Sequence, residues 1–519
     1  MKKIKYTALG SMIVVSALLG SCDKNFTEIN KDPINIVETT PEKLLAPALV
    51  NVMNANMLRN RNFNNELMQV TVTISDGDAT VFRYEFRNTF SDNLWNSWYP
   101  QLTNLKDVYA LASAGKAANK SYQGISLVAQ SWVSSMLTDT YGDVPYSEAN
   151  KGKEGLLEPV FDKQKDIYLD MFKKLEEANT LLAAGTAIKA TSDPVFKGDI
   201  GKWRRFCNSL YLRLLLRVSG KSEVSAQCIA KIKEIVETNA ANYPVMGSNS
   251  DVAIIRWNGG TNTTDPFTSP FVNGVRAQDF RAPSMASFFI DRLRDWGDPR
   301  IDNSAKWGNS GVNRLGISQG PNGYSGVPSG YAVGSGFLRQ AYFISSDDAT
   351  NGTRSLQVNP LTGILMTYAE LQFILAEASV KGWITGSAEQ YYYRGMAAAI
   401  NYWVPNFPAN PADAAFVEYV DAADLTWDPA GSLDNKMEQI HIQKYYSLFC
   451  TDLQQWFEYR RTGHPVLPKG PGLRNGGVMP ARMVYPVYVQ SANPTNYRNA
   501  VAGQGADLIS TNVWWQKAN

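Results

Sequence analysis

The sequence offers few residues with the types and spacing that catalysis needs. It contains two histidines, His441 and His464, and neither has a metal-ligand partner at the spacing of a zinc site. Residues 316–320 (GISQG) have the letters of a nucleophile elbow, which requires a buried strand before the serine and a helix after it. Turn-forming residues flank this segment on both sides. We therefore expect no serine hydrolase, no metal ion, no cofactor and no enzyme activity.

The acidic residues predict turns rather than a site. Asp76 and Asp78 flank a glycine, and Asp347 is followed by Asp348, so each cluster offers two hard oxygen ligands and a calcium site is the alternative. Residues 139–149 (DTYGDVPYSEA) contain a glycine and a proline that predict a tight structural turn after a helix. Among 48 acidic residues a pair of catalytic carboxylates remains an open alternative.

Cys22 is the residue with the clearest predicted chemistry. A basic start with three lysines, a short apolar stretch and the small residues Gly20 and Ser21 precede it, which is the layout of a secretory signal peptide. The apolar part is shorter than the about 20 residues that span a bilayer. A cysteine directly after Leu-Gly-Ser is typical of a bacterial lipobox, in which the thiol is lipidated and the chain is cut before it. We expect a signal peptide at 1–21 and a lipidated tether at 22–40.

The charge balance argues against a nucleic-acid partner, and the hydropathy pattern argues against a second membrane-spanning segment. The signal segment holds three of the fifty basic residues, which leaves 47 basic and 48 acidic side chains in the mature chain. A nearly neutral chain gives no electrostatic reason to bind nucleic acid. No second stretch is long and apolar enough to cross a membrane, so the membrane contact is expected through the lipid anchor alone.

The remaining cysteines do not predict a disulfide framework. Cys207, Cys228 and Cys450 are an odd number, and Cys207 and Cys450 lie within apolar helical patterns. A free cysteine in such a place behaves as a small buried hydrophobe. A bridge between Cys207 and Cys228, across two adjacent helices, is the alternative.

Apolar residues spaced by three or four positions predict an all-helical scaffold. The pattern is clearest in five segments, and short glycine-containing turns join some of them into pairs. The pair 368–380 and 388–403 resembles a tetratricopeptide helix–turn–helix, whose members must stack on neighbours. The segments are 161–182, 203–218, 368–380, 391–403 and 440–460.

One region interrupts the helices. Residues 301–340 contain nine of the 39 glycines, with asparagine, serine and proline between them, which excludes long helices. We expect a single domain at 41–519 with a loop-rich insertion at about 251–365, and long loops in a domain are often functional. Aromatic rings on such loops stack on sugar rings. Core packing is favoured for Trp95 and Trp98. The candidate ligand-binding residues are Trp257, Trp296, Trp307, Tyr324 and Tyr331.

Several blocks of the sequence resemble one family in the same order and along nearly the whole mature chain. They are CDKNFTEINKDPINIVETTPEKLLAPAL from Cys22, TDTYGDVPYSEA at 138–149, WRRFCNSLYLRLLLRVS at 203–219, DPRID at 298–302, YAELQFILAEASVKGW at 368–383, IQKYYSLFCTDLQQWFEYRRTGHP at 442–465 and PARMVYPVYVQSANPTNY at 480–497. Together they are similar to the SusD-like (SusD/RagB) outer-membrane lipoproteins of Bacteroidetes.

The resemblance implies a fold and a role. The fold would be α-helical, with tetratricopeptide-like pairs supporting an irregular, loop-rich ligand-binding face. The protein would sit on the cell exterior, anchored in the outer membrane, as the lid of a SusC-like TonB-dependent transporter. It would capture an oligomeric nutrient, usually a glycan, without catalysis. A peptide-binding lid and a lipid-anchored glycoside hydrolase are the alternatives.

Overall fold

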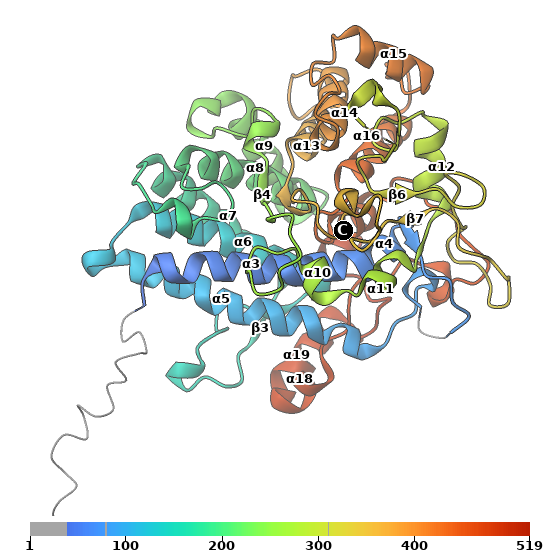
Figure 1. Cartoon of the computed structure of the whole chain (residues 1–519). Helices are drawn as coiled ribbons and strands as arrows, with labels where there is room; N and C mark the ends of the chain where they lie inside the picture. Colours follow the sequence, from blue (N-terminus) through green and yellow to red (C-terminus); the bar gives the residue numbers. More distant parts are fainter. Residues whose placement is uncertain (1–38, 78–79, 310) are drawn as a thin grey trace, which may run out of the picture. The chain divides into compact units, whose positions relative to one another are not determined.

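The computed structural model describes residues 39–77, 80–309 and 311–519 (Figure 1). Cys22, the expected signal peptide and nearly all of the expected tether lie outside these residues. Residues 41–519 form one compact unit. This unit is built mainly of helices with a few short strands, so the all-α fold class is confirmed. None of the helices in the described part is long and apolar enough to cross a membrane.

The first half of the chain is a stack in which each long helix packs on the next one in the sequence. Figure 1 shows the first two side by side. In the helix at 164–183, Ile167, Met171 and Leu175 are buried, as their spacing predicts. The stacked helices are α3 (Pro41–Arg59), α5 (Asp92–Ser113), α6 (Lys120–Tyr141), α7 (Gln164–Ala183), α8 (Ile200–Val218) and α9 (Ser222–Lys233).

A second group of helices packs on α8 through its first member, α13. The helices α13 and α14 form the pair that the sequence predicts, and Gly382 (φ +72°) lies in the turn between them. Gly395 lets them approach, because a Cβ there would lie 2.8 Å from the ring of Phe373. This group comprises α13 (Tyr368–Val380), α14 (Ala388–Trp403), α16 (Leu433–Ser447) and α17 (Gln454–Thr462).

The predicted continuous helix at 440–460 is wrong. The chain forms α16 and α17 with a break between them, and Cys450 lies in the break rather than in a helix. Cys450 (φ +66°) and Asp452 (φ +31°) are left-handed, a conformation that cannot continue an α-helix. The Asp452 carboxylate accepts from the Leu453 N–H, while Asn60 donates to the Asp452 carbonyl at 2.6 Å. These contacts hold the sharp turn.

In the described part of the chain the strands are two to four residues long and form four separate antiparallel pairs. In β2–β3, Val144 pairs with Asp162 and Pro145 with Phe161. The pairs are β1 (Thr71–Val72) with β5 (Ser284–Met285), β2 (Val144–Pro145) with β3 (Phe161–Asp162), β4 (Ala253–Ile255) with β8 (Gly363–Met366), and β6 (Ile317–Ser318) with β7 (Tyr342–Phe343).

The remaining helices are short, and several lie in the loop-rich part of the chain. The described residues of 301–340 contain only β6 and a three-residue 3-10 helix at Ala305–Trp307, as the glycines predict. The short helices are α4 (Asn65–Leu67), α10 (Pro270–Gly274), α11 (Ala277–Arg281), α12 (Ser287–Asp295), α15 (Ala414–Ala422), α18 (Val487–Ala492) and α19 (Pro494–Gln504).

The core is continuous through both helix groups. Every residue of α6 from Ile125 to Tyr141 is buried, because neighbouring helices cover all of its sides. Cys207, Cys228 and Cys450 are free and buried, so the alternative bridge between Cys207 and Cys228 is not formed. Burial raises the pKa of all three thiols, to about 12 for Cys228.

Candidate functional site

The structure buries three of the five aromatic residues that the sequence offers as candidate ligand-binding residues. Trp257 is 3% exposed, Tyr331 4% and Trp307 9%. Trp307 packs edge-on against Phe407 with ring centroids 5.1 Å apart. The backbone of β8 approaches Trp257 so closely that a Cβ at Gly363 would lie 3.2 Å from its ring. Distant segments therefore cover these three rings in this conformation.

The other two predicted rings, Trp296 and Tyr324, are half-buried. Trp296 packs edge-on against Tyr446 at 5.3 Å. The Tyr324 hydroxyl donates to Asn303 at 2.9 Å and accepts from Asn313 at 2.8 Å. Both residues are thus tied to the scaffold, and each keeps part of its ring accessible to a ligand.

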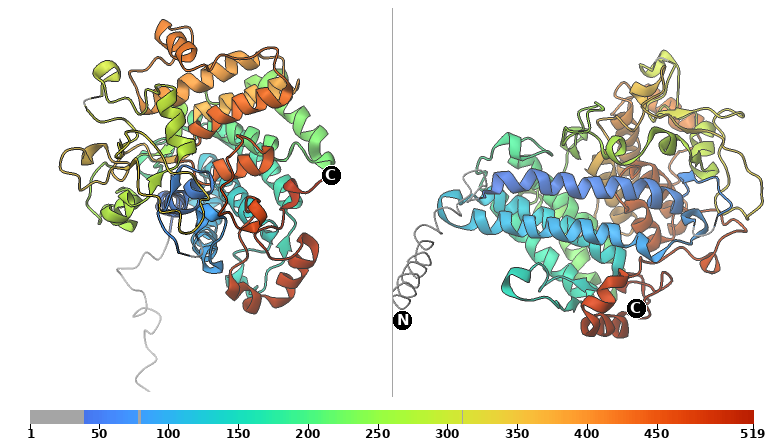
Figure 2. Two further views of the ribbon diagram at one scale, coloured as in Figure 1. Left: turned by 90° about the vertical axis from the view of Figure 1, so that its right-hand side faces the viewer. Right: turned by 60° about the horizontal axis from the view of Figure 1, so that its bottom comes forward.

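Tyr331 lies at the base of three loops that pack on one another, and we call this arrangement the loop cluster. It comprises residues 73–77 with 80–84, residues 329–340, and residues 469–478. Figures 1 and 2 show these loops near the C-terminal end of α3. The cluster combines segments that are up to about 400 positions apart in the sequence, which is why no local pattern predicts it.

Arg83 holds the base of the loop cluster together. Its guanidinium is buried, donates from Nε to the Tyr331 carbonyl at 2.9 Å, and donates from Nη2 to the Ser75 carbonyl at 2.9 Å. The same group lies 4.8 Å from the ring centre of Tyr331 and 4.6 Å from that of Phe82. A desolvated cation over an aromatic face is attractive. Arg83 therefore fixes Tyr331 in place.

Close backbone contact joins the second and third loops. The Gly472 N–H donates to the Gly330 carbonyl at 2.7 Å, and a Cβ at Gly472 would lie 2.2 Å from the Tyr331 carbonyl oxygen. Gly330 itself is left-handed at φ +66°. Only glycine fits these positions without a shift of the backbone.

Glu66 is buried next to the loop cluster and accepts hydrogen bonds from its first loop. Its carboxylate accepts from the Thr73 hydroxyl at 2.5 Å and from the Phe82 N–H at 3.3 Å. Burial raises the pKa of Glu66 to about 7, against the lowering effect of these two hydrogen bonds and of Arg61. The carboxyl group therefore titrates near neutral pH at the point where the first loop joins the core.

The tip of the second loop exposes an aromatic residue that the sequence analysis missed. Phe337 is 39% exposed and packs edge-on against Tyr331 with centroids 5.2 Å apart. Val333 and Leu338 are exposed beside it along the loop. The sequence signal is weak but present: an apolar pair, Phe337 and Leu338, directly follows Gly-Ser-Gly in a polar loop. An exposed ring on a fixed base is suited to stacking on a flat ligand face.

A cavity of about 340 Å³ offers a second aromatic surface, on the side of α5 that faces β2–β3. Trp95, Tyr99 and Phe161 form its aromatic wall, and Asn150 and Asn493 are among its polar groups. The buried Oδ1 atom of Asn150 has no hydrogen-bond partner. As expected, Trp98 belongs to the core, and Trp95 is almost fully buried. We call this cavity the Trp95 cavity.

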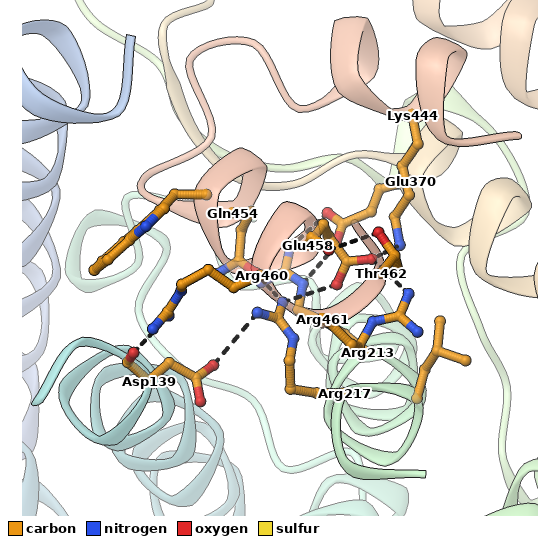
Figure 3. A network of polar contacts seen from close by, with 12 residues as sticks. Asp139, Arg213, Arg217, Glu370, Lys444, Gln454, Glu458, Arg460, Arg461 and Thr462 are labelled. Atoms are coloured by element: carbon orange, nitrogen blue, oxygen red, sulfur yellow. Dashed lines mark hydrogen bonds and ion pairs between the residues drawn. The ribbon is translucent and has the colours of Figure 1, made fainter. Parts of the chain in front are cut away.

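A network of charged side chains lies buried in the core (Figure 3). Arg213 and Glu370 form a buried pair at 2.6 Å, and Lys444 contacts Glu458 at 2.6 Å. Arg217 lies 3.6 Å from Asp139, which also accepts from Tyr168 and Trp515. These contacts join α6, α8, α13, α16 and α17. The segment 139–149 therefore has a structural role, as its turn-forming residues predict.

One part of this network has the composition of a metal site. Ligand atoms of Glu377, His441 and Glu458 lie within 4.8 Å of one another. Arg461 already donates to Glu377 at 2.6 Å and to Glu458 at 2.8 Å, so a guanidinium holds the position that a cation would take. Burial lowers the pKa of His441 despite its contact with Glu377. His441 Nε2 lies 3.2 Å from the Glu377 carboxylate but makes no hydrogen bond of normal geometry.

His464, which follows the end of α17, is largely buried and contacts a carboxylate. Its side chain is 11% exposed and Nδ1 lies 2.7 Å from Glu438. The acidic turns behave as predicted where the structure describes them: Asp347 pairs with Arg281 at 2.9 Å, and Asp348 accepts from the backbone of its own turn.

Comparison with known proteins assigns the family. The model of the SusD-like family described as "starch-binding associating with outer membrane" matches residues 33–486. The chain belongs to this SusD-like family, as its sequence blocks predict. None of the curated proteins matches the chain significantly.

Solved structures show the same fold. A chitin-binding protein is 26% identical, with a TM-score of 0.69, over 92% of this chain and all of its own. A SusD homologue from Bacteroides fragilis is 24% identical, with a TM-score of 0.74, over 93% of this chain and all of its own. A chitin-binding SusD homologue from Flavobacterium johnsoniae is 20% identical, with a TM-score of 0.74, over 92% of this chain and 99% of its own.

Proposed function

We propose that this protein is a cell-surface lipoprotein that binds an oligosaccharide and forms the lid of a SusC-like TonB-dependent transporter, without catalysis. The family supports nutrient binding at the outer membrane. The proposed anchor is Cys22, through the lipobox that precedes it. Several acyl chains hold a protein at a membrane durably, since each buried methylene contributes about 0.8 kcal/mol.

The loop cluster is the proposed place of capture, and the exposed ring of Phe337 on its fixed base is the observation that carries this choice. Tyr331 is buried and packs against Phe337, so it holds the Phe337 ring in place and does not itself stack on the ligand. Trp296 and Tyr324 remain proposed contacts because part of each ring is accessible. Trp257 and Trp307 are too deeply buried to stack on a ligand in this conformation.

A binding experiment with intact sugars tests the proposal. Purified protein is titrated calorimetrically with maltohexaose and with N-acetylchitohexaose, and the sugars are recovered and sized afterwards. We expect one of them to bind and to be recovered uncleaved. Phe337→Ala should weaken binding by about fivefold or more, because a stacking contact contributes about 1–3 kcal/mol, and should leave thermal stability unchanged.

Matched variants decide between the loop cluster and the Trp95 cavity. Leu157→Ala removes an exposed apolar side chain at that cavity and should leave binding unchanged. Weaker binding in Leu157→Ala with normal binding in Phe337→Ala would move the site to the cavity. Shortened sugars would establish a glycoside hydrolase instead. Binding of hexapeptides but of neither sugar would establish the peptide-binding alternative.

The lid role has its own measurement. We expect a large TonB-dependent transporter to co-purify with the protein from detergent-solubilised outer membranes. A ligand that favours the closed lid over the open one should strengthen this association. Recovery of the protein without any transporter, in the presence and absence of the sugar, would contradict the lid role while leaving sugar binding intact.

A further inference from the structure

A cavity of about 390 Å³ lies apart from the residues of the loop cluster. It is formed where the first turn of α7 meets the first turn of α9, the end of α19 and a short 3-10 helix, η13 (Trp514–Gln516). We call it the Trp514 cavity. Its lining residues include Asp143, Gln164, Lys165, Glu223, Trp514 and Lys517.

Trp514 supplies an aromatic wall. Its neighbour Trp515 is a core residue whose indole N–H donates to Asp139 at 2.8 Å. Trp514 is instead half-buried and lines the cavity. Its indole N–H donates to Glu223 at 3.1 Å, and its ring lies 6.3 Å from that of Tyr168. The ring is thus held in place while part of it remains accessible.

Gln164 is among the residues that line the same cavity, but its side chain is closed to solvent. The residue is fully buried, and its amide Nε2 donates to the Thr138 carbonyl at 2.7 Å. Its Oε1 atom is buried and has no hydrogen-bond partner. A buried acceptor without a donor is costly. Because this oxygen is closed to solvent, a ligand in the cavity would not reach it in this conformation.

The charges of the cavity balance. Three carboxylates and three ammonium groups line it: Asp143, Asp166 and Glu223 with Lys163, Lys165 and Lys517. Lys165 pairs with Glu223, and this hydrogen bond, with that from Trp514, lowers the pKa of Glu223. A site with no net charge favours a neutral ligand, and its many donors and acceptors favour one that is rich in hydroxyl groups.

We propose that the Trp514 cavity is a second binding site for a neutral saccharide unit, separate from the loop cluster. One face of a sugar ring stacks on Trp514, because the apolar C–H face of the ring meets the negative π face of the indole. Hydroxyl groups of the sugar exchange hydrogen bonds with Glu223 and Lys517, which line the cavity and are accessible. The inference goes beyond the proposed function and rests on it only for the class of ligand.

The test separates the two sites by their own signals. The protein is labelled with 5-fluorotryptophan, and Trp514→Phe identifies the Trp514 resonance among the 13 tryptophans. Maltohexaose or N-acetylchitohexaose should shift this resonance, in the wild type and equally in Phe337→Ala. In calorimetry Trp514→Ala should weaken one binding event by about fivefold or more and should leave unchanged the other event, which Phe337→Ala weakens.

Two further variants keep the result decisive. Lys165→Ala removes a half-exposed wall residue and is expected to fold even if Trp514→Ala does not; it should also weaken the second event. Glu389→Gln, on the exposed first turn of α14, is the control. No shift of the Trp514 resonance with either sugar, while calorimetry still shows binding that depends on Phe337, would overturn the second site and leave the proposed function standing. A shift without any effect of Phe337→Ala would support the second site and overturn the loop cluster.

Discussion

At the scale of single residues, burial rather than residue type decides what an aromatic side chain can do. Trp257 and Trp307 lie on loops, yet their rings pack in the core. Phe337 is smaller and its side chain has no polar atom, yet its ring reaches solvent. Sequence alone could not separate these cases, because the partner that covers Trp307 is Phe407, one hundred positions away.

Glu66 predicts a pH dependence of stability. Its pKa rises from an unfolded value of 4.5 to about 7 in the folded protein, mainly through burial. The folded state therefore binds more protons than the unfolded state between these pH values. Protonation of Glu66 therefore favours the folded state, and this contribution to the free energy of unfolding is fully present below pH 4.5. It is lost as the pH rises through 7, and the total loss is about 3 kcal/mol at most.

Glu66→Gln isolates this effect. The variant carries a permanently neutral side chain, and the Thr73 hydroxyl can turn to accept from its amide. We expect the melting temperature of Glu66→Gln, relative to that of the wild type, to increase between pH 5 and pH 7.5. Other titrating groups cancel in this difference. A constant difference across the range would show that Glu66 is charged in the folded protein.

At the scale of elements, sequence predicts helices well and their interruptions poorly. Apolar spacing places α13 at its observed residues, and α8 starts three residues earlier than expected. The sequence does not predict the break after α16, because its left-handed residues are Cys450 and Asp452. A glycine at either position would have indicated a left-handed conformation. The sequence does not predict the loop cluster either, because its contacts join loops that are hundreds of residues apart in the chain.

Gly472 should be essential to the loop cluster. A Cβ in Gly472→Ala would lie 2.2 Å from the Tyr331 carbonyl oxygen, so one of the two loops must move. We expect destabilisation of about 1–3 kcal/mol and weaker sugar binding. Gly220→Ala is the control, because a Cβ there meets no atom within 4 Å. Calorimetric melting and titration measure both effects; equal behaviour of the two variants would show that the loops adapt freely.

At the scale of the whole molecule, the buried ionic network joins the two helix groups. Glu458 on α17 contacts Arg217 on α8, Lys444 on α16 and Arg461 on its own helix. Burial alone would raise the pKa of Glu458, but these cations hold it well below its usual range. The sequence shows each charge but not the network, since its members come from five helices.

Removing one partner should therefore destabilise the protein strongly. Glu458→Gln leaves three cations around a neutral amide, and breaking a buried pair costs about 3–5 kcal/mol. We expect a correspondingly lower midpoint in urea unfolding. Asp279→Asn is the matched control, since its pair with Arg276 is exposed and should contribute little. Similar midpoints for Glu458→Gln and the wild type would mean that the network does not join the two groups.

The three buried cysteines have a practical consequence for observing the proposed lid. Their thiols are shielded and weakly acidic, so a maleimide dye at neutral pH should leave them unmodified. A thiol introduced by Phe337→Cys would then be the one reactive handle among the described residues. A fluorophore attached there, with an energy-transfer acceptor on the proposed transporter, would report in intact membranes how the distance between the loop tip and the transporter changes as nutrient arrives.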